Sequence, residues 1–187
     1  MVKDKEMQAK KITVIPIQPA THVRSTQGDR WLFAVSPEYL EEYDKKKLLL
    51  TGRKGGNLRR MRQLEKYNAY KQEIRNWAVR NGFQMPLGYF AIWFYIPAPP
   101  SWRPRKREEM IGMPHMSTPD CDNLLKSFFD GIMPRKNKTK NEKGTDDRKI
   151  HCYSAFKVWC AEGEGRIVIR EYDQDVYLEA FTDNTHQ

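Results

Sequence analysis

The stretch Thr118-Pro-Asp-Cys-Asp-Asn-Leu-Leu-Lys-Ser-Phe-Phe-Asp-Gly, residues 118–131, is the most informative part of this chain. A short helix is predicted from about Asp122 to Phe129. Pro119 has a fixed φ and stiffens the approach to this helix, and Gly131 and Pro134 follow its end. The stretch therefore predicts an ordered loop that leads directly into a helix.

One face of this helix is charged and the other is apolar. Asp122, Lys126 and Asp130 are spaced four residues apart, so they share a face. The apolar side chains are expected to pack into the core: Leu124, Leu125, Phe128 and Phe129. Asp120 lies at the junction of loop and helix, where a carboxylate can cap free N–H groups or bind a cation. The spacing alone leaves both interpretations open.

A second acidic pair, Asp146-Asp147, follows in a polar loop just before a predicted strand. Carboxylates that gather in one place repel each other unless a cation neutralises them. Hard oxygen ligands of this kind suit Mg²⁺. If the two acidic stretches meet in the folded chain, they predict a divalent metal site; otherwise they are helix caps and solvated side chains.

Outward from this stretch, strands alternate with helices. The long helix is predicted at 58–81, because apolar residues recur there in steps of three and four and Gly82 follows. The strands are predicted at 12–18, 89–96, 150–160 and 166–172, the last two forming a hairpin around Gly163 and Gly165. This order predicts a single α/β (α+β) domain over 1–187, with a mixed β-sheet covered by the long helix and the short motif helix.

The core of this domain is expected at about 58–172, together with the first strand, and residues 20–57 form an insertion of unknown role. Within it, Ser36 as N-cap and Pro37 at the first helical position predict a helix to about Leu50, before Gly52. Residues 31–35 are ambiguous and could form a short strand. The chain beyond Asp173 has no clear pattern.

Composition favours a polyanionic partner. Thirty-three Lys and Arg residues against 24 Asp and Glu give a formal net charge of +9, and phosphate contacts by basic residues supply much of the affinity for nucleic acids. No apolar run is long enough to span a bilayer, so no membrane partner is expected. The N-terminus has no apolar region typical of a signal peptide, which predicts a cytoplasmic protein. The three cysteines form no CxxC pair and are expected to be reduced.

Taken together, these residues resemble the RusA family of Holliday-junction resolvases (endodeoxyribonuclease RusA-like). That family has the motif Asp-x-Asp-Asn-Leu-x-Lys-x-x-x-Asp, followed by Asp-Asp at a strand entrance. The matching positions here are Asp120, Asp122, Asn123, Leu124, Lys126, Asp130, Asp146 and Asp147. Two features depart from the compact members, namely a longer loop at 133–145 and the insertion at 20–57.

The resemblance implies a Mg²⁺ site, with Mn²⁺ as an alternative ion. Carboxylates at Asp120, Asp122 and Asp147 would bind the metal, and Lys126 would also be catalytic. Asp130 is expected to pair with Lys126 rather than to bind metal. Asn123 would orient a carboxylate or only stabilise the helix start, and Asp146 would orient a ligand or be solvated.

The function implied is a metal-dependent, structure-selective DNA endonuclease that resolves four-way (Holliday) junctions by paired symmetric nicks in recombination and repair. Two symmetric nicks favour a C2 homodimer. The alternative is a non-catalytic DNA-binding module that uses basic loops. A nucleotide triphosphate enzyme is disfavoured because the phosphate-binding Gly-x-x-x-x-Gly-Lys-Ser/Thr loop is missing from the sequence.

Two basic loops flank the motif in sequence and are predicted to contact the DNA backbone; solvated loop charge is the alternative. Their residues are Arg103, Arg105, Lys106, Arg107, Arg135, Lys136, Lys138 and Lys140. Trp102 could stack on an unpaired base or cover the sheet edge. A third basic patch, Arg53-Lys54 with Arg59, Arg60 and Arg62, is equally open to either interpretation.

Overall fold

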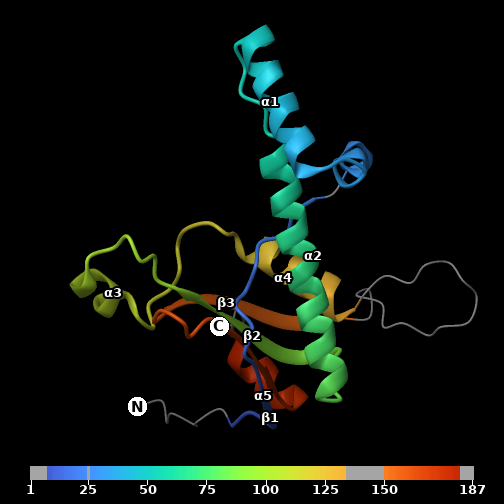
Figure 1. The fold of residues 1–187 in the computed structure, drawn as a ribbon. Coiled ribbons are helices and arrows are strands. Elements are labelled where there is room, and N and C mark those ends of the chain that lie inside the picture. The colour runs from blue at the N-terminus through green and yellow to red at the C-terminus, as the bar shows by residue number, and fades with distance from the viewer. Residues whose placement is uncertain (1–7, 25, 134–149, 182–187) are drawn as a thin grey trace, which may run out of the picture.

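The centre of the fold is a mixed sheet, seen in a computed structural model that describes residues 8–24, 26–133 and 150–181 (Figure 1). Its strands are β1 (Lys11–Ile15), β2 (Gly88–Pro97), β3 (Cys152–Cys160) and β4 (Arg166–Glu171). Their order within the described residues is β1-β4-β2-β3. β2 pairs with β3 in parallel, whereas β4 is antiparallel to both β2 and β1. The predicted α+β class with a mixed sheet is confirmed.

The predicted hairpin of the last two strands is wrong, because β2 lies between β3 and β4. Phe90, Ala91, Ile92 and Phe94 of β2 are fully buried, so this strand is apolar on both faces. Such a strand is most stable in the middle of a sheet, where both of its edges form hydrogen bonds. The chain therefore passes from β3 to β4 around the end of β2, through a turn with Gly163 at φ 77°.

Two helices, α2 (Asn57–Arg80) and α4 (Cys121–Ile132), pack on the same face of the sheet (Figure 1). The buried cluster between them combines side chains of both helices with alternate residues of the central strands. These residues include Tyr70, Ile74, Phe90, Ile92, Phe94, Leu124, Phe128, Ile167 and Ile169. The long helix predicted at 58–81 is confirmed to within a residue at each end, with Gly82 at φ 57°.

The motif helix is longer than predicted and ends at Ile132 rather than at Phe129. Gly131 is buried inside it, and a Cβ atom on Gly131 would lie 3.1 Å from Ile74 Cγ2. Gly131 thus permits the close approach of α4 to α2, although a glycine at this point of the sequence suggested the end of the helix.

The insertion forms a 3-10 helix, η1 (Gln27–Phe33), and a regular helix, α1 (Pro37–Thr51). The alternative of a short strand at 31–35 is wrong, because Leu32 is buried in a second apolar cluster by the turn of η1. That cluster comprises Leu32, Leu40, Met61 and Leu64. The prediction for α1 is confirmed, since Ser36 Oγ accepts a hydrogen bond from the Tyr39 backbone N–H at 3.2 Å.

α1 is also fastened to the start of α2. The carboxylate of Asp44 accepts hydrogen bonds from Asn57 Nδ2 at 2.9 Å and from the Leu58 backbone N–H at 3.2 Å. This side chain of α1 therefore caps α2, in place of a local N-cap residue. In Figure 1, α1 and the first turns of α2 stand out beyond the sheet.

Two further helices were not predicted. α3 (Pro104–Met110) replaces part of the expected basic loop, and α5 (Gln174–Phe181) follows β4. Tyr177 of α5 packs with Ala91 and Tyr172 in a third buried cluster, on the sheet face opposite α2 and α4. None of the helices in the described parts of the chain combines the length and apolar character needed to cross a membrane.

Candidate active site

Asp120 and Asp122 stand at the start of α4. Asp120 occupies the N-cap position with extended backbone (φ −71°, ψ 153°), yet its side chain caps no N–H group. Asp122 lies in the first turn, and both side chains are exposed. Neither carboxylate has a hydrogen bond or an ion pair with any residue that the structure describes. Among the described residues, nothing occupies either carboxylate in place of an external cation.

Asp130, at the other end of the motif, does not pair with Lys126 as predicted. Its Oδ2 accepts a hydrogen bond from the Tyr67 hydroxyl at 2.8 Å, and His22 Nε2 lies 3.7 Å away. Lys126 is exposed and forms no ion pair within the described residues. The expected i,i+4 pair is wrong because α2, packed against α4, supplies Asp130 with a donor from a buried side chain, Tyr67.

His22 brings the insertion into this network. Its backbone N–H donates to the Asn123 carbonyl at 3.3 Å, and its ring meets Tyr67 edge-on at 5.4 Å. Burial, and then the positive charge of Lys126, lower the pKa of His22, although Asp130 opposes this. The imidazole is therefore mainly neutral at pH 7. Sequence reasoning missed His22 and Tyr67, since nothing in the local pattern links either residue to the motif.

Lys157 on β3 holds the loop that leads to Asp120. Its Nζ donates to the Ser117 carbonyl at 2.8 Å and to the Pro119 carbonyl at 2.9 Å. The Thr118–Pro119 peptide bond between these acceptors is cis. A strand of the sheet thus fixes the residue immediately before the first carboxylate. Lys157 was also missed, because a lysine inside a strand carries no sequence signal for such a contact.

A buried hydroxyl anchors the middle of α4. Ser127 is fully buried, and its Oγ donates to the Ala20 carbonyl and lies 2.8 Å from the Leu124 carbonyl. Residues 20–22 are therefore attached to α4 at two points, through Ser127 and through the Asn123 carbonyl. The motif helix is held from α2, from the sheet and from the insertion.

The donor set fits a hard divalent cation in part. Two free carboxylates two residues apart suit Mg²⁺, which uses few protein carboxylates and keeps several waters. Within the described residues, no group of three or more His, Cys, Asp or Glu side chains could complete a metal site. The predicted third ligand Asp147 and its neighbour Asp146 lie outside the described residues, as do Arg135, Lys136, Lys138 and Lys140.

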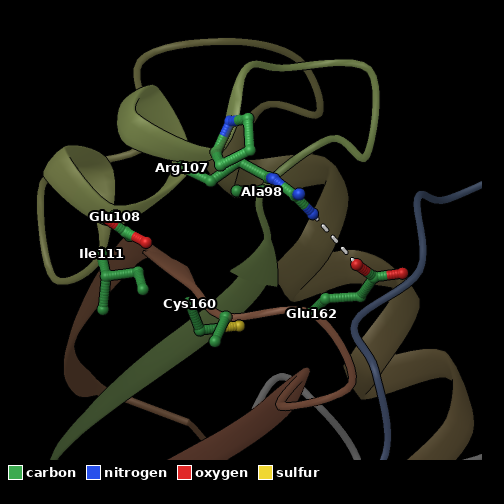
Figure 2. A pocket seen from close by; sticks show the side chains of 8 residues that line it. Ala98, Arg107, Glu108, Ile111, Cys160 and Glu162 are labelled. Atoms are coloured by element: carbon green, nitrogen blue, oxygen red, sulfur yellow. Dashed lines mark hydrogen bonds and ion pairs between the residues drawn. The ribbon is translucent and has the colours of Figure 1, made fainter.

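The predicted DNA contacts at 103–107 lie on or just before α3. Arg105 pairs with Glu109 at 2.8 Å, and Arg107 pairs with Glu162 at 3.1 Å. Figure 2 shows the Arg107–Glu162 pair beside a hollow of about 150 Å³ between α3 and the turn after β3. Arg103 is exposed. The charges of two of these four residues are thus matched within the protein.

Trp102 covers the sheet edge. Its ring packs on Trp159 of β3 at 4.9 Å between centroids, and Lys106 Nζ lies 4.1 Å from the Trp102 ring. The segment 112–115 adds further cover, because Gly112 and His115 donate backbone hydrogen bonds to β3 carbonyls at 2.9 Å. Of the two interpretations of Trp102, the contact with the sheet edge is the one observed.

Comparison with known proteins gives one match. The model of a protein family described as Endodeoxyribonuclease RusA matches residues 50–170. The matched region contains α2, the loop and helix with Asp120 and Asp122, and Lys157, but neither β1 nor η1. No curated protein and no solved structure matches the chain.

Proposed function

This chain belongs to the RusA family of endodeoxyribonucleases, and from that premise we propose that it resolves four-way DNA junctions by Mg²⁺-dependent phosphodiester hydrolysis. The observation that supports the proposal is the exposure of Asp120 and Asp122 and the lack of partners for them among the described residues. They are exposed and unpaired among the described residues, at the start of a helix whose opposite face is buried. A helix serving only as part of the core would gain from using such residues as caps.

In this proposal Asp120, Asp122 and Asp147 hold Mg²⁺, or Mn²⁺ in its place. When bound, the ion polarises a phosphoryl oxygen, lowers the pKa of water and orients the reacting groups. The protein's part is to hold the carboxylates where the cation and the scissile phosphate can meet. The hydrogen bonds from Lys157 to the carbonyls of residues 117 and 119 supply that support for Asp120.

Lys126 is proposed to contact the DNA. It lies one helical turn after Asp122 on the same face of α4, and its side chain is exposed and unpaired among the described residues. An ammonium group there would donate to a phosphate oxygen and offset negative charge that develops during hydrolysis.

Supporting roles are proposed for three polar residues of the motif. Asn123 would orient a ligand carboxylate from the first turn of α4, and Asp146 would do so from the second acidic stretch. Asp130 is engaged by the Tyr67 hydroxyl, so its role is to hold α4 against α2 rather than to bind metal. Asp130→Asn should therefore be less damaging to cleavage than Asp122→Asn.

Paired nicks on opposing strands need two copies of the site related by a two-fold axis. We therefore propose a C2 homodimer on a four-way junction, in DNA recombination and repair. The basic residues Arg103, Arg105, Lys106 and Arg107, together with those at 135–140, would contact the DNA backbone in this complex.

The test uses a labelled four-way junction and a linear duplex of the same sequence, each with Mg²⁺ or with EDTA. We expect symmetric nicks in the junction alone, and only with Mg²⁺. Asp122→Asn should abolish cleavage and retain or tighten junction binding, because a negative charge near phosphate is removed. Asp175→Asn is a matched control, since Asp175 is also an exposed aspartate in the first turn of a helix.

Junction binding without cleavage by the wild-type protein would instead identify a DNA-binding module. Full turnover by Asp122→Asn would exclude Asp122 as a ligand. Equal cutting of the linear duplex would remove junction selectivity from the proposal and leave the nuclease assignment intact.

A further inference from the structure

The first turns of α2 carry a row of basic and polar side chains that the proposed reaction does not use. We call Arg59, Arg62, Gln63 and Lys66 the basic stripe. All four side chains are exposed, and they line a surface hollow of about 390 Å³ together with Leu58. Their spacing of three and four residues places them on one side of the helix.

No acid among the described residues forms an ion pair with the stripe, although the hydrogen bond from Lys45 and then the charge of Arg62 lower the pKa of Glu41 on α1. Arg59, Arg62 and Lys66 form no ion pair with any described residue. Arg60, which lies between them in sequence, differs in this respect, because its guanidinium binds the Asp29 carboxylate at 3.0 Å. Of the third basic patch noted in the sequence, Arg60 is therefore structural, whereas Arg53, Lys54, Arg59 and Arg62 are exposed and unpaired among the described residues.

Two lysines of the neighbouring helix α1 are matched by acids. On α1, Lys45 pairs with Glu41 at 2.9 Å and Lys46 pairs with Glu42 at 2.8 Å. Lys47 of α1 is exposed and unpaired among the described residues, but it is one charge, whereas three such charges follow one another along one side of α2. This concentration of charge makes the stripe suited to an anion.

The stripe lies along the same line of α2 as residues that pack against the motif helix. Arg59, Gln63, Lys66 and Tyr70 follow one another in steps of four, three and four, so they lie along one line of the helix. Tyr70 is buried in the cluster that contains Leu124 and Phe128 of α4. This line of α2 is therefore apolar at Tyr70, where it covers the core, and basic at Arg59 and Lys66, toward the end of α2 that extends past the sheet (Figure 1).

The position is close enough to the site for one DNA molecule to reach both. At 1.5 Å per residue, Arg59 lies about 12 Å along α2 from Tyr67, whose hydroxyl binds Asp130. Asp130 lies about a further 12 Å along α4 from Asp122, which makes a path of about 24 Å along the two helices. That is only a fraction of a turn of B-DNA, which is about 34–36 Å. The Asp44 cap fixes the projection, so the stripe is presented on a rigid support.

We propose that the basic stripe binds the phosphate backbone of a duplex arm of the DNA whose junction lies at the site. This gives the insertion a role: α1 and η1 pack against the start of α2 and hold it in position to contact the DNA arm. The inference rests on the proposed function for the identity of the substrate. It adds a contact surface outside the motif and its two flanking basic loops.

The test compares two triple variants with the wild-type protein. The stripe variant is Arg59→Gln, Arg62→Gln and Lys66→Gln, which keeps the helix propensity and the side-chain stems. The control variant is Lys10→Gln, Lys11→Gln and Arg80→Gln. It removes the same number of positive charges from the start of β1, where Lys10 and Lys11 form ion pairs with Asp173 and Glu171, and from the far end of α2. Junction affinity is measured in EDTA, so that no cleavage occurs, between 50 and 200 mM salt, and circular dichroism verifies that each variant is folded.

Plots of log K against log salt have a negative slope, and each lost phosphate contact reduces its magnitude by about 0.9. The slope of the stripe variant should therefore be smaller in magnitude than that of the wild type by about 2.7. Between 50 and 200 mM salt, the factor by which junction affinity falls should therefore be roughly 40 times smaller for the stripe variant than for the wild type. The control variant should keep most of the wild-type slope. Equal slopes for the two variants would overturn the inference, and so would wild-type protein that does not bind the junction.

Failure of the inference and failure of the proposed function give different results. If the wild type cleaves the junction but the stripe variant binds like the control, only the role of the stripe is lost. If binding depends on the stripe but no condition gives cleavage, the stripe remains a DNA contact and the nuclease mechanism is lost.

Discussion

Replacing Lys157 with methionine should uncouple DNA binding from cleavage. Lys157 contacts neither Asp120, Asp122 nor Asp130, the motif carboxylates that the structure describes, but its Nζ donates to two carbonyls of the loop that ends at Asp120. Methionine keeps most of the side-chain volume and removes both hydrogen bonds. The loop is then free to shift, and Asp120 with it.

The size of the effect follows from the two contacts, at 2.8 and 2.9 Å. A hydrogen bond from a charged donor contributes about 1.5–3 kcal/mol. One of the two is exposed and the other only partly buried, so a total near the lower end, about 2 kcal/mol of unfolding free energy, is expected. For a chain of this length that lowers the melting temperature by about 4–8 °C. A displacement of roughly 1 Å at Asp120 would slow cleavage about 100-fold.

The assay is single-turnover cleavage of a four-way junction at saturating protein, well below the melting temperature, over a series of Mg²⁺ concentrations. We expect slower cleavage, a several-fold higher half-saturating Mg²⁺ concentration and nearly unchanged junction affinity. Lys10→Met is the control, because Lys10 is exposed beside β1, at the opposite edge of the sheet from Lys157, and among the described residues its side chain pairs with Asp173 alone. Wild-type cleavage and Mg²⁺ dependence in Lys157→Met would refute the positioning role. A loss of junction affinity as large as the loss of rate would refute it too.

Three further substitutions test how the fold supports the site. Asp44→Ala removes the cap of α2 and should lower the unfolding free energy by about 1 kcal/mol, measured by urea denaturation. The hydrogen bond from Arg60 holds the pKa of Asp29 below its usual range, so the carboxylate stabilises the fold at pH values above about 4 and loses this effect as the pH falls further. The difference in melting temperature between wild type and Asp29→Asn should therefore shrink below pH 4, and a constant difference would contradict the pairing. Gly131→Leu would force a side chain against Ile74 and should cost about 2 kcal/mol, whereas no loss of stability would show that α2 and α4 can separate freely.

The local parts of the fold were predictable, because their signals are local. Ser36 and Gly52 mark the two ends of α1, and Gly82 marks the end of α2, through backbone chemistry that depends on neighbouring residues alone. α3 had a local signal too, since Pro104 stands at its first position, but the density of basic residues suggested a loop. Strand pairing depends on distant residues. The glycines at 163 and 165 indicate a turn, but the burial of both faces of β2 decides which strand lies next to which.

The same distinction applies to the site. Asp120, Asp122 and Lys126 could be singled out because they belong to one short motif, and the structure places them at the exposed start and face of one helix. The contacts of Lys157 and Tyr67 could not be predicted, because they join the motif to a strand and a helix far away in the chain. The expected Lys126–Asp130 pair failed for that reason as well, since spacing along a helix says nothing about a donor on the neighbouring helix.

These remote contacts explain how Asp120 and Asp122 can be held in position without hydrogen bonds or ion pairs of their own to the described residues. A residue at an N-cap position ordinarily contributes about 1 kcal/mol by binding a free N–H group, and Asp120 forgoes that contribution. α4 does not depend on it, because Ser127 is bound to the Ala20 carbonyl, Gly131 lies close against α2, and Lys157 holds the entering loop. The helix is thus fixed by its buried face and its supports, and the stability that they supply leaves its acidic end free for a cation. If Asp120 and Asp122 bind the metal as proposed, these supports would keep their geometry before the ligand binds, as catalysis at such a site requires.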